Sequence, residues 1–313
     1  MSAVAEEESK TKIFCCASCG TGGVDDVELM DCTACYLVRY CSLKCQEDHR
    51  PDHEEECKQR AAELHDEILF KQPESTRGDC PICCVPLSFD MDKSTTILMS
   101  CCGKIICDGC FYTNIRYTIN RRVQPKCPFC REDLPDPDTE EWNERLLKRI
   151  EVNDPIAMCQ MGWDRYDKGD YKAAFEYWTK SAALGDAVAH YRLGALYRDG
   201  EGVEKDEKTA VCHFEEAAIA GHPIARHYLG WLEFVNNRMD RAAKHWIIAA
   251  KLGFDDSLGN VKLAYKDGHV SKEDFAAALR GHRAAIVATK SPQRQEAEGK
   301  VACTSLKIRG VDA

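Results

Sequence analysis

Cysteine is the residue type whose number and spacing in this 313-residue chain could do chemistry. There are twenty cysteines, and seventeen of them lie before residue 131, most in pairs separated by two or three residues. Two thiolates separated by two residues can reach one metal ion from a tight turn, whereas a three-residue separation places them on one face of a helix. The spacing therefore predicts metal sites in preference to isolated buried or reactive thiols.

The first cysteine block, residues 16–57, contains eight potential ligands. A structural zinc ion takes four soft or borderline ligands in a tetrahedron, so eight ligands predict two zinc ions. Cys15 is expected to be a bystander beside the first ligand, and His49 lies at the wrong distance from Cys57 to replace His53. The predicted metal ligands of this block are Cys16, Cys19, Cys32, Cys35, Cys41, Cys45, His53 and Cys57.

The order of these pairs, together with the stretch from Tyr40 to His53, resembles a MYND-type zinc finger. Fingers of this family bind short proline-containing peptides in a shallow groove and carry out no reaction. The resemblance implies a peptide-binding role for Gln46, whereas Arg50 stands where the family commonly has a tryptophan, so a different ligand preference is expected. Because the pairs interleave in that family, the resemblance also implies two ligand sets: Cys16, Cys19, Cys41 and Cys45 in one, and Cys32, Cys35, His53 and Cys57 in the other.

The second cysteine block, residues 80–131, also contains eight ligands and predicts two more zinc ions. It opens with the sequence C-P-I-C and closes with C-P-F-C-R, an arrangement that resembles a RING-type zinc finger. Lys104 occupies the position where a RING ordinarily has a histidine, and the adjacent Cys101 and Cys102 can supply the two missing ligands, as in all-cysteine variants. Cys84 is expected to be a spare apolar residue. The resemblance implies one set made of Cys80, Cys83, Cys107 and Cys110, and another made of Cys101, Cys102, Cys127 and Cys130.

RING fingers hold a ubiquitin-conjugating enzyme and favour attack on its ubiquitin thioester by restricting geometry, without a nucleophile of their own. Three residues match the usual contact surface of that family: Ile82 and Pro128 between paired ligands, and Arg131 directly after the last ligand. The alternative is that Ile82 and Pro128 only shape the zinc-binding turns. Residues 111–122 are predicted to form a helix with Phe111 and Ile115 on one side.

Charge and composition disfavour several classes of protein. The net charge of −10 at pH 7 is unfavourable for a general nucleic-acid binder, whose affinity comes from neutralising phosphates. No apolar run approaches the ~18 residues of a membrane span, and the polar residues 1–11 lack the apolar segment of a signal peptide. We therefore expect an intracellular protein, cytoplasmic or nuclear, whose cysteines stay reduced and which binds proteins or peptides but no nucleic acid and no membrane.

Glycines recur with a period of 32 to 36 residues behind the cysteine blocks, in one series at 162, 194 and 230 and in another at 185, 221 and 253. Paired alanines and aromatic residues lie between them. Such a period is typical of a solenoid of helix pairs, in which small residues allow close helix contact and aromatic residues fill the core. The stretch 197–210 resembles a Sel-one-like repeat, a relative of the tetratricopeptide repeat, and arrays of that kind gather partner proteins.

The chain is thus predicted to consist of two small zinc-stabilised cross-brace modules followed by an all-α solenoid of helix-pair repeats. A short helical pattern between the modules ends at Pro73, and Pro135 and Pro137 favour an extended linker after them. The predicted organisation is a disordered segment (1–13), a MYND-type finger (16–57), a RING-type finger (80–131), a linker (132–140), the helical repeats (141–285) and a flexible tail (286–313).

Two functions are consistent with these modules. In the first, the RING-type finger recruits a conjugating enzyme while the MYND-type finger and the repeats select a substrate, which would make the chain a RING-type ubiquitin ligase. In the alternative, all three modules are binding surfaces of a non-catalytic, zinc-dependent protein-interaction scaffold. Catalysis by zinc-bound water is disfavoured because each ion is expected to have four protein ligands, and a lysine methyltransferase is disfavoured because the chain has no glycine-rich cofactor loop.

Overall fold

A computed structural model describes residues 15–19, 29–73, 78–87, 96–135 and 139–298. The chain divides into two compact units, Met1–Lys71 and Gln72–Ala313. Each unit has its own secondary structure and is treated by itself.

The first unit is built around a long helix. Two short antiparallel strands, β1 (Met30–Asp31) and β2 (Arg39–Tyr40), precede α1 (Leu43–Leu69). Ser42 caps α1 by accepting a hydrogen bond from the backbone N–H of Cys45. The sequence predicted a separate short helix after residue 57, but α1 continues without interruption from the metal-ligand turns to Leu69, with Pro51 inside it.

The second unit begins with the second cysteine-rich module. Strands β3 (Thr96–Leu98) and β4 (Ile105–Cys107) form an antiparallel hairpin, and α2 (Asp108–Arg121) follows β4 directly. Apart from cysteines, the buried apolar side chains of this module are those of Leu87, Met99, Ile106 and Ile115 among the described residues. A core of this size cannot stabilise a fold alone.

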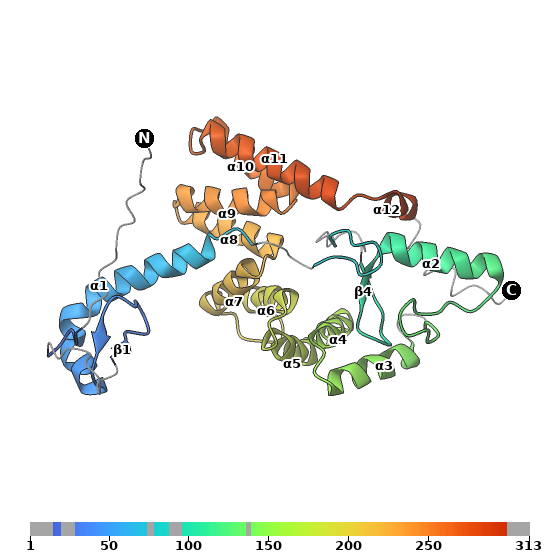
Figure 1. The fold of residues 1–313 in the computed structure, drawn as a ribbon, viewed down its shortest axis with the longest axis horizontal. Coiled ribbons are helices and arrows are strands. Elements are labelled where there is room, and N and C mark those ends of the chain that lie inside the picture. Colours follow the sequence, from blue (N-terminus) through green and yellow to red (C-terminus); the bar gives the residue numbers. More distant parts are fainter. Residues whose placement is uncertain (1–14, 20–28, 74–77, 88–95, 136–138, 299–313) are drawn as a thin grey trace, which may run out of the picture. The chain divides into compact units, whose positions relative to one another are not determined.

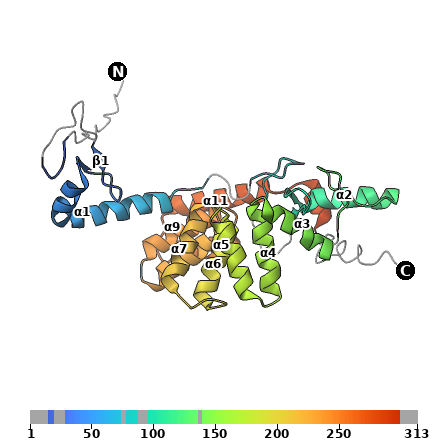
Figure 2. The ribbon, with the colours of Figure 1, turned by 90° about the horizontal axis from the view of Figure 1, so that it is seen from below.

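The helical array follows the second module (Figure 1 and Figure 2). Helices α4 and α5, α6 and α7, and α8 and α9 pack as successive pairs. Several of these helices begin at an aspartate whose carboxylate accepts a backbone N–H, such as Asp154, Asp186 and Asp206. The helices of the array are α3 (Glu140–Glu151), α4 (Pro155–Asp167), α5 (Tyr171–Ala182), α6 (Ala187–Asp199), α7 (Glu207–Ile219), α8 (Pro223–Val235), α9 (Met239–Lys251), α10 (Asp255–Lys266) and α11 (Lys272–Ala288).

The first glycine series marks the closest contacts inside the helix pairs. A Cβ atom at Gly162 would lie 2.5 Å from Cδ1 of Trp178, and one at Gly194 would lie 2.8 Å from Cε1 of Phe214. Gly230 repeats the arrangement, since a Cβ atom there would lie 2.5 Å from Nε1 of Trp246. The missing side chains therefore make room for one buried ring in each pair.

The second glycine series ends the second helix of each pair. Gly185, Gly221 and Gly253 have φ angles of 84°, 90° and 94°, in the left-handed region that favours glycine. Helix pairs at the predicted spacing are therefore confirmed.

The C-terminal region differs from the predicted flexible tail. Helix α11 continues to Ala288, and a short helix, α12 (Pro292–Ala297), packs against α2. The physical reason is that this stretch finds long-range partners that a local pattern does not reveal. Residues 299–313 and the predicted disordered segment 1–13 lie outside the described residues.

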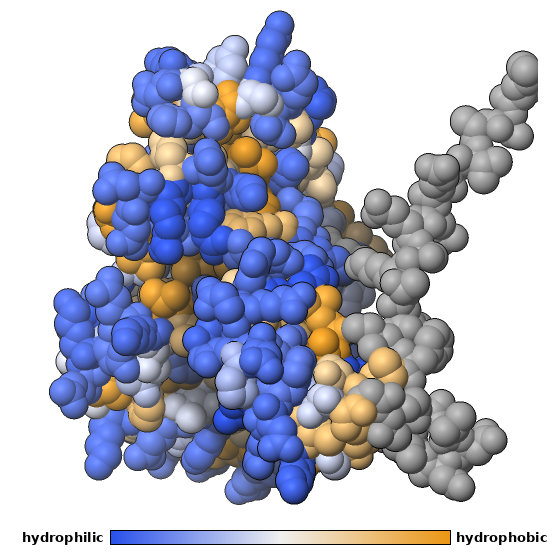
Figure 3. Space-filling model, turned by 90° about the vertical axis from the view of Figure 1, so that its left-hand side faces the viewer, coloured by the Kyte–Doolittle hydropathy of each residue, from blue (hydrophilic) through white to orange (hydrophobic). Residues whose placement is uncertain are grey.

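The face of the molecule drawn in Figure 3 is mainly polar. Hydrophilic residues cover most of the face in Figure 3, and hydrophobic residues are gathered in small groups between them. Among the described helices, none combines the length and the apolar character that a membrane span requires.

Exchange of Gly230 for alanine should destabilise the array, because the new methyl group would overlap the Trp246 ring. Over-packing of this kind costs about 1–3 kcal/mol. Urea titration followed by far-UV circular dichroism should therefore show a lower unfolding midpoint. Gly259→Ala is the matched control, since nothing lies within 4 Å of a Cβ atom at that position. An unchanged or higher midpoint in Gly230→Ala would contradict the packing described here.

Candidate metal centres

Four groups of potential metal ligands occur in the described part of the chain. In each group the four ligand atoms all lie within 4.8 Å of one another. The structure brings all sixteen residues singled out in the sequence together, in the same four sets. These sets are Cys16, Cys19, Cys41 and Cys45 (site 1), Cys32, Cys35, His53 and Cys57 (site 2), Cys80, Cys83, Cys107 and Cys110 (site 3), and Cys101, Cys102, Cys127 and Cys130 (site 4).

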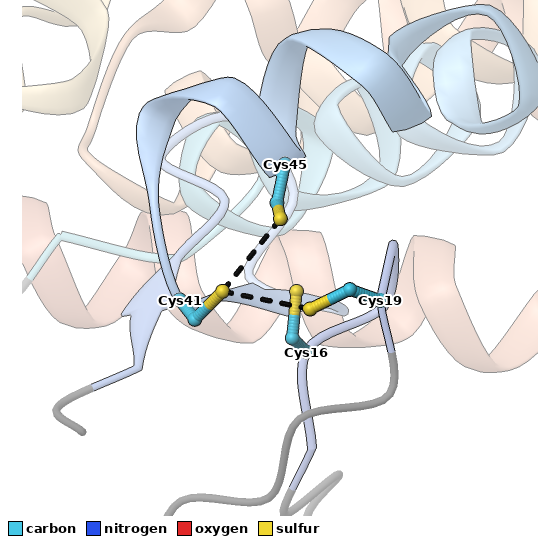
Figure 4. A group of neighbouring side chains, drawn as sticks. All are labelled: Cys16, Cys19, Cys41 and Cys45. Atoms are coloured by element: carbon cyan, nitrogen blue, oxygen red, sulfur yellow. Dashed lines mark hydrogen bonds between the residues drawn. The ribbon is translucent and has the colours of Figure 1, made fainter.

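The sulfur–sulfur distances fit a tetrahedral metal ion. Four sulfurs at about 2.3 Å from a central zinc ion would be about 3.8 Å apart. In site 1 the Sγ atom of Cys41 lies 3.6 Å from that of Cys19 and 3.6 Å from that of Cys45 (Figure 4). The Cys83–Cys107 distance in site 3 is 3.8 Å. A disulfide needs about 2.05 Å, so these thiols are not arranged as bridges.

The local fold of the first unit explains how sites 1 and 2 form. Cys41 follows β2 and Cys45 lies in the first turn of α1, so the start of this helix completes site 1. His53 and Cys57 are four residues apart on α1 and share a face, which completes site 2. His53 is only 5% exposed, and its Nε2 lies 3.1 Å from Sγ of Cys35.

A supporting contact behind site 2 was not predicted. The His49 ring stacks on the His53 ring with centroids 5.7 Å apart, and its Nδ1 lies 3.1 Å from the hydroxyl oxygen of Tyr40. The sequence analysis treated His49 only as a competing ligand. His49 therefore packs against the ligand ring without being a ligand in any of the four groups.

One thiol in each of the four sites is favoured as a thiolate. Burial raises the pKa of Cys16, but hydrogen bonds from the backbone N–H groups of Cys19, Cys41 and Ser18 outweigh this effect and lower it to about 6. The same balance of burial and backbone hydrogen bonds lowers the pKa of Cys32 to about 6 and that of Cys80 to about 7. In site 4, burial raises the pKa of Cys127, but backbone hydrogen bonds from Cys130 and Phe129 outweigh this effect and lower it. The backbone N–H groups of the tight turns around the paired cysteines therefore stabilise the thiolate form, which is the form that binds a cation.

The thiols of Cys41 and Cys57 resist ionisation because neighbouring sulfurs crowd them. Hydrogen bonds with Cys19 and Cys45 raise the pKa of Cys41 to about 12. Burial and hydrogen bonding to Cys32 and Cys35 raise the pKa of Cys57 to about 12. Four such sulfurs cannot all be ionised without a positive charge between them. The donor sets therefore fit a soft divalent metal ion, and four protein ligands would leave it no open position.

The second module is joined to the start of the helical array. Leu98 of β3 packs with the buried cluster of Leu146, Ala157 and Met161 from α3 and α4. Gly103, next to the site 4 ligand Cys102, approaches the array so closely that a Cβ atom would lie 2.7 Å from Nη2 of Arg149. Apart from the glycine itself, no pattern in the sequence predicts this contact.

The predicted surface residues of the second module are accessible. Ile82 is 43% exposed, and Pro128 and Arg131 are also exposed. Cys84 is exposed and belongs to none of the four sites, and the same is true of Cys15.

A pocket of about 430 Å³ lies on the first unit beside site 2. Its wall includes Gln46, the predicted peptide-binding residue, and Arg50, which stands where a tryptophan was expected. Glu54 and Lys58 continue the wall along α1, and the Lys58 ammonium donates a hydrogen bond to Glu54 Oε1 at 2.5 Å.

Family models match two parts of the chain. Residues 16–57 match the MYND finger, and residues 155–186 and 187–222 match the Sel1 repeat. These matches leave the RING resemblance of residues 80–131 as a prediction.

Two curated proteins are similar to parts of this chain. The uncharacterized protein NMB1327 of Neisseria meningitidis serogroup B is 32% identical over 107 residues, which are 34% of this chain and 22% of that protein. DAP3-binding cell death enhancer 1 of Mus musculus is 23% identical over 196 residues, which are 50% of this chain and 38% of that protein. The chain therefore spans less than half the length of either relative.

Two solved structures are also similar. The Sel1 repeat protein from Oxalobacter formigenes has a TM-score of 0.42 and 25% identity, covering 57% of this chain and 71% of that chain. The protective antigen c5321 of uropathogenic Escherichia coli, which has an SLR fold, has a TM-score of 0.38 and 20% identity, covering 66% of this chain and 41% of that chain. From the family models and the structure, the chain carries a MYND finger, then a second cysteine-rich module, then Sel1-like helix-pair repeats.

Proposed function

We propose that this protein is a zinc-dependent protein-interaction scaffold. The observation that carries the proposal is that each metal site gathers four protein ligands and leaves no position for a substrate or a reactive water. The metal ions would then stabilise small modules, and the functional surfaces would be the side chains displayed around them. A reducing compartment, the cytoplasm or the nucleus, would keep the thiols available for metal.

Zinc is the metal that fits the sites best. The donors are fifteen cysteines and one histidine, and tetrahedral sites with sulfur and nitrogen ligands are typical of structural zinc. Each cysteine-rich module buries little apolar surface, whereas one structural zinc site contributes an apparent ~10–16 kcal/mol. We therefore assign four zinc ions, two to each module.

The pocket beside site 2 is the proposed peptide-binding surface of the MYND finger. Gln46 offers an amide donor and acceptor at the pocket wall, while Ala34 and Ala61 supply small apolar surface. Arg50 replaces an aromatic contact with a guanidinium, which can hydrogen-bond to peptide carbonyl groups. Short extended peptides fit these features better than a folded partner does.

The helical array is the second proposed binding surface. Trp231 and Phe234 of α8 are 47% and 50% exposed, and they lie three residues apart on one face of the helix. Exposed aromatic side chains are common anchors of protein interfaces. The mouse relative is named for binding DAP3, and we propose that the repeats of this chain also bind a protein.

Ubiquitin ligation is the second candidate function. The observation that favours it is that Ile82, Pro128 and Arg131 are all exposed on the second module. A conjugating enzyme could contact these residues without displacing any metal ligand. The scaffold remains the main proposal because it requires only the binding surfaces described above.

Zinc binding can be tested by counting ions in the purified protein. Native mass spectrometry should show four zinc ions in the wild type. Cys107→Ala should lose at least one ion and unfold the second module, because the missing site contributes an apparent ~10–16 kcal/mol. Cys84→Ala, which removes an exposed cysteine outside the sites, should keep all four. Metal-free wild-type protein, or disulfides between the ligand cysteines, would overturn the assignment.

Peptide binding can be tested with a panel of fluorescein-labelled, proline-containing peptides and fluorescence anisotropy. Gln46→Ala should weaken binding about 2- to 10-fold, as expected for one lost hydrogen bond of about 0.5–1.5 kcal/mol. Gln59→Ala is the matched control, because this exposed glutamine lies on α1 outside the pocket. Equal effects of the two exchanges, or no binding by the zinc-loaded protein, would exclude this pocket as the peptide site.

The two candidate functions differ in an autoubiquitination assay with a broad panel of conjugating enzymes. A scaffold should form no ubiquitin chains with any of them. Activity that disappears in Ile82→Ala and in Arg131→Ala, with zinc content preserved, would instead establish the ligase. Ile68→Ala serves as the control, because Ile68 is an exposed isoleucine of α1 outside the second module.

A further inference from the structure

Helix α12 is packed against the second module, far from it in sequence (Figure 1). The contact is close at Gly109, which lies between the site 3 ligands Cys107 and Cys110. A Cβ atom at Gly109 would lie 2.6 Å from the backbone nitrogen of Arg294 and 2.7 Å from the carbonyl carbon of Gln293. The main chain of α12 therefore rests directly on the start of α2.

Hydrogen bonds of the Arg294 side chain stabilise the contact between α12 and the second module. Its Nη1 donates hydrogen bonds to the carbonyl oxygens of Pro86 at 2.6 Å and Thr289 at 2.8 Å. Its Nη2 donates to the carbonyl oxygen of Val85 at 2.9 Å and lies 4.0 Å from Sγ of Cys83. The guanidinium thus connects α12 to Val85 and Pro86, which directly follow the turn that carries the first two ligands of site 3.

An ion pair between Arg116 of α2 and Glu296 of α12 adds a second connection. Both of its side chains are about half exposed, so the pair contributes little energy by itself. The partly buried connection through Arg294, with three hydrogen bonds to backbone carbonyl groups, is therefore the stronger one.

The charge of site 3 explains why an arginine is placed there. Four thiolates around one divalent ion carry a net charge of −2, and a guanidinium nearby reduces it. The Arg294 guanidinium, which is always protonated, lies 4.0 Å from Sγ of the ligand Cys83. Groups that hydrogen-bond to metal ligands tune affinity for the metal.

We infer that Arg294 is an outer partner of metal site 3 and that zinc binding at this site and docking of α12 are thermodynamically linked. Linkage is reciprocal, so α12 should strengthen zinc binding by the same factor by which zinc strengthens docking. The inference rests on the zinc assignment proposed above, and it makes the C-terminal helix a positioning element of a metal site formed some two hundred residues earlier in the chain.

The test exposes the full-length protein to increasing concentrations of a metal chelator and follows two measurements. Alkylation by iodoacetamide and peptide mass spectrometry report which cysteines have lost metal, and hydrogen exchange reports protection of the α12 amides. In Arg294→Met, the site 3 cysteines should become reactive at a chelator concentration about 10- to 100-fold lower than in the wild type. The site 4 cysteines, Cys101, Cys102, Cys127 and Cys130, should be unaffected.

Two further variants complete the design. Arg280→Met removes an exposed arginine of α11 and should behave as the wild type. Gly109→Ala keeps every ligand but should push α12 away, so the α12 amides should exchange faster while four zinc ions are still bound, and site 3 should then release its metal more readily.

The outcomes separate the linkage from the zinc assignment. Wild-type protein without zinc would overturn both. Four bound ions, together with unchanged site 3 reactivity in Arg294→Met or unchanged α12 protection in Gly109→Ala, would overturn the linkage alone.

Discussion

The interaction on which the structure depends is the mutual repulsion of thiolates. Each module collects sulfur atoms within a few ångströms of one another, in a region too small to bury much hydrocarbon. Backbone N–H groups stabilise one thiolate in several sites, but they cannot neutralise the whole set. A divalent cation changes repulsion into attraction, so formation of these modules and binding of metal are one event.

The helical array is organised by a different constraint, the fit of one ring against one glycine. The pairs Gly162–Trp178, Gly194–Phe214 and Gly230–Trp246 recur along the array. Since a single methyl group at the glycine would collide with the ring, the distance between the two helices of each pair is set by close packing. In the described part of the array, side-chain packing therefore has the stabilising role that metal ligands have in the two modules.

Local sequence patterns were sufficient to predict most of the metal ligands and the helix pairs. Paired ligands lie within a turn or a helix of one another, and the resemblance to known fingers implied the interleaved sets that the structure brings together. The glycine period was also readable from the sequence, because each glycine contacts a helix that is adjacent in the chain. What could not be predicted depends on long-range contacts. Arg294, Gly103 and Gly109 each look ordinary until the residues that they touch, far along the chain, are known.

The second module makes contacts at both ends of the helical array: Leu98 and Gly103 contact α3 and α4, and α2 packs against α12, which follows the last helix of the array. Open solenoids tolerate the gain or loss of whole repeats, because each repeat contacts only its neighbours. In this chain, the gain or loss of a repeat would move α12 away from its contact with α2. The contact between α2 and α12 thus constrains the number of repeats. Duplication of one helix pair, which an open solenoid would tolerate, would here separate α12 from α2.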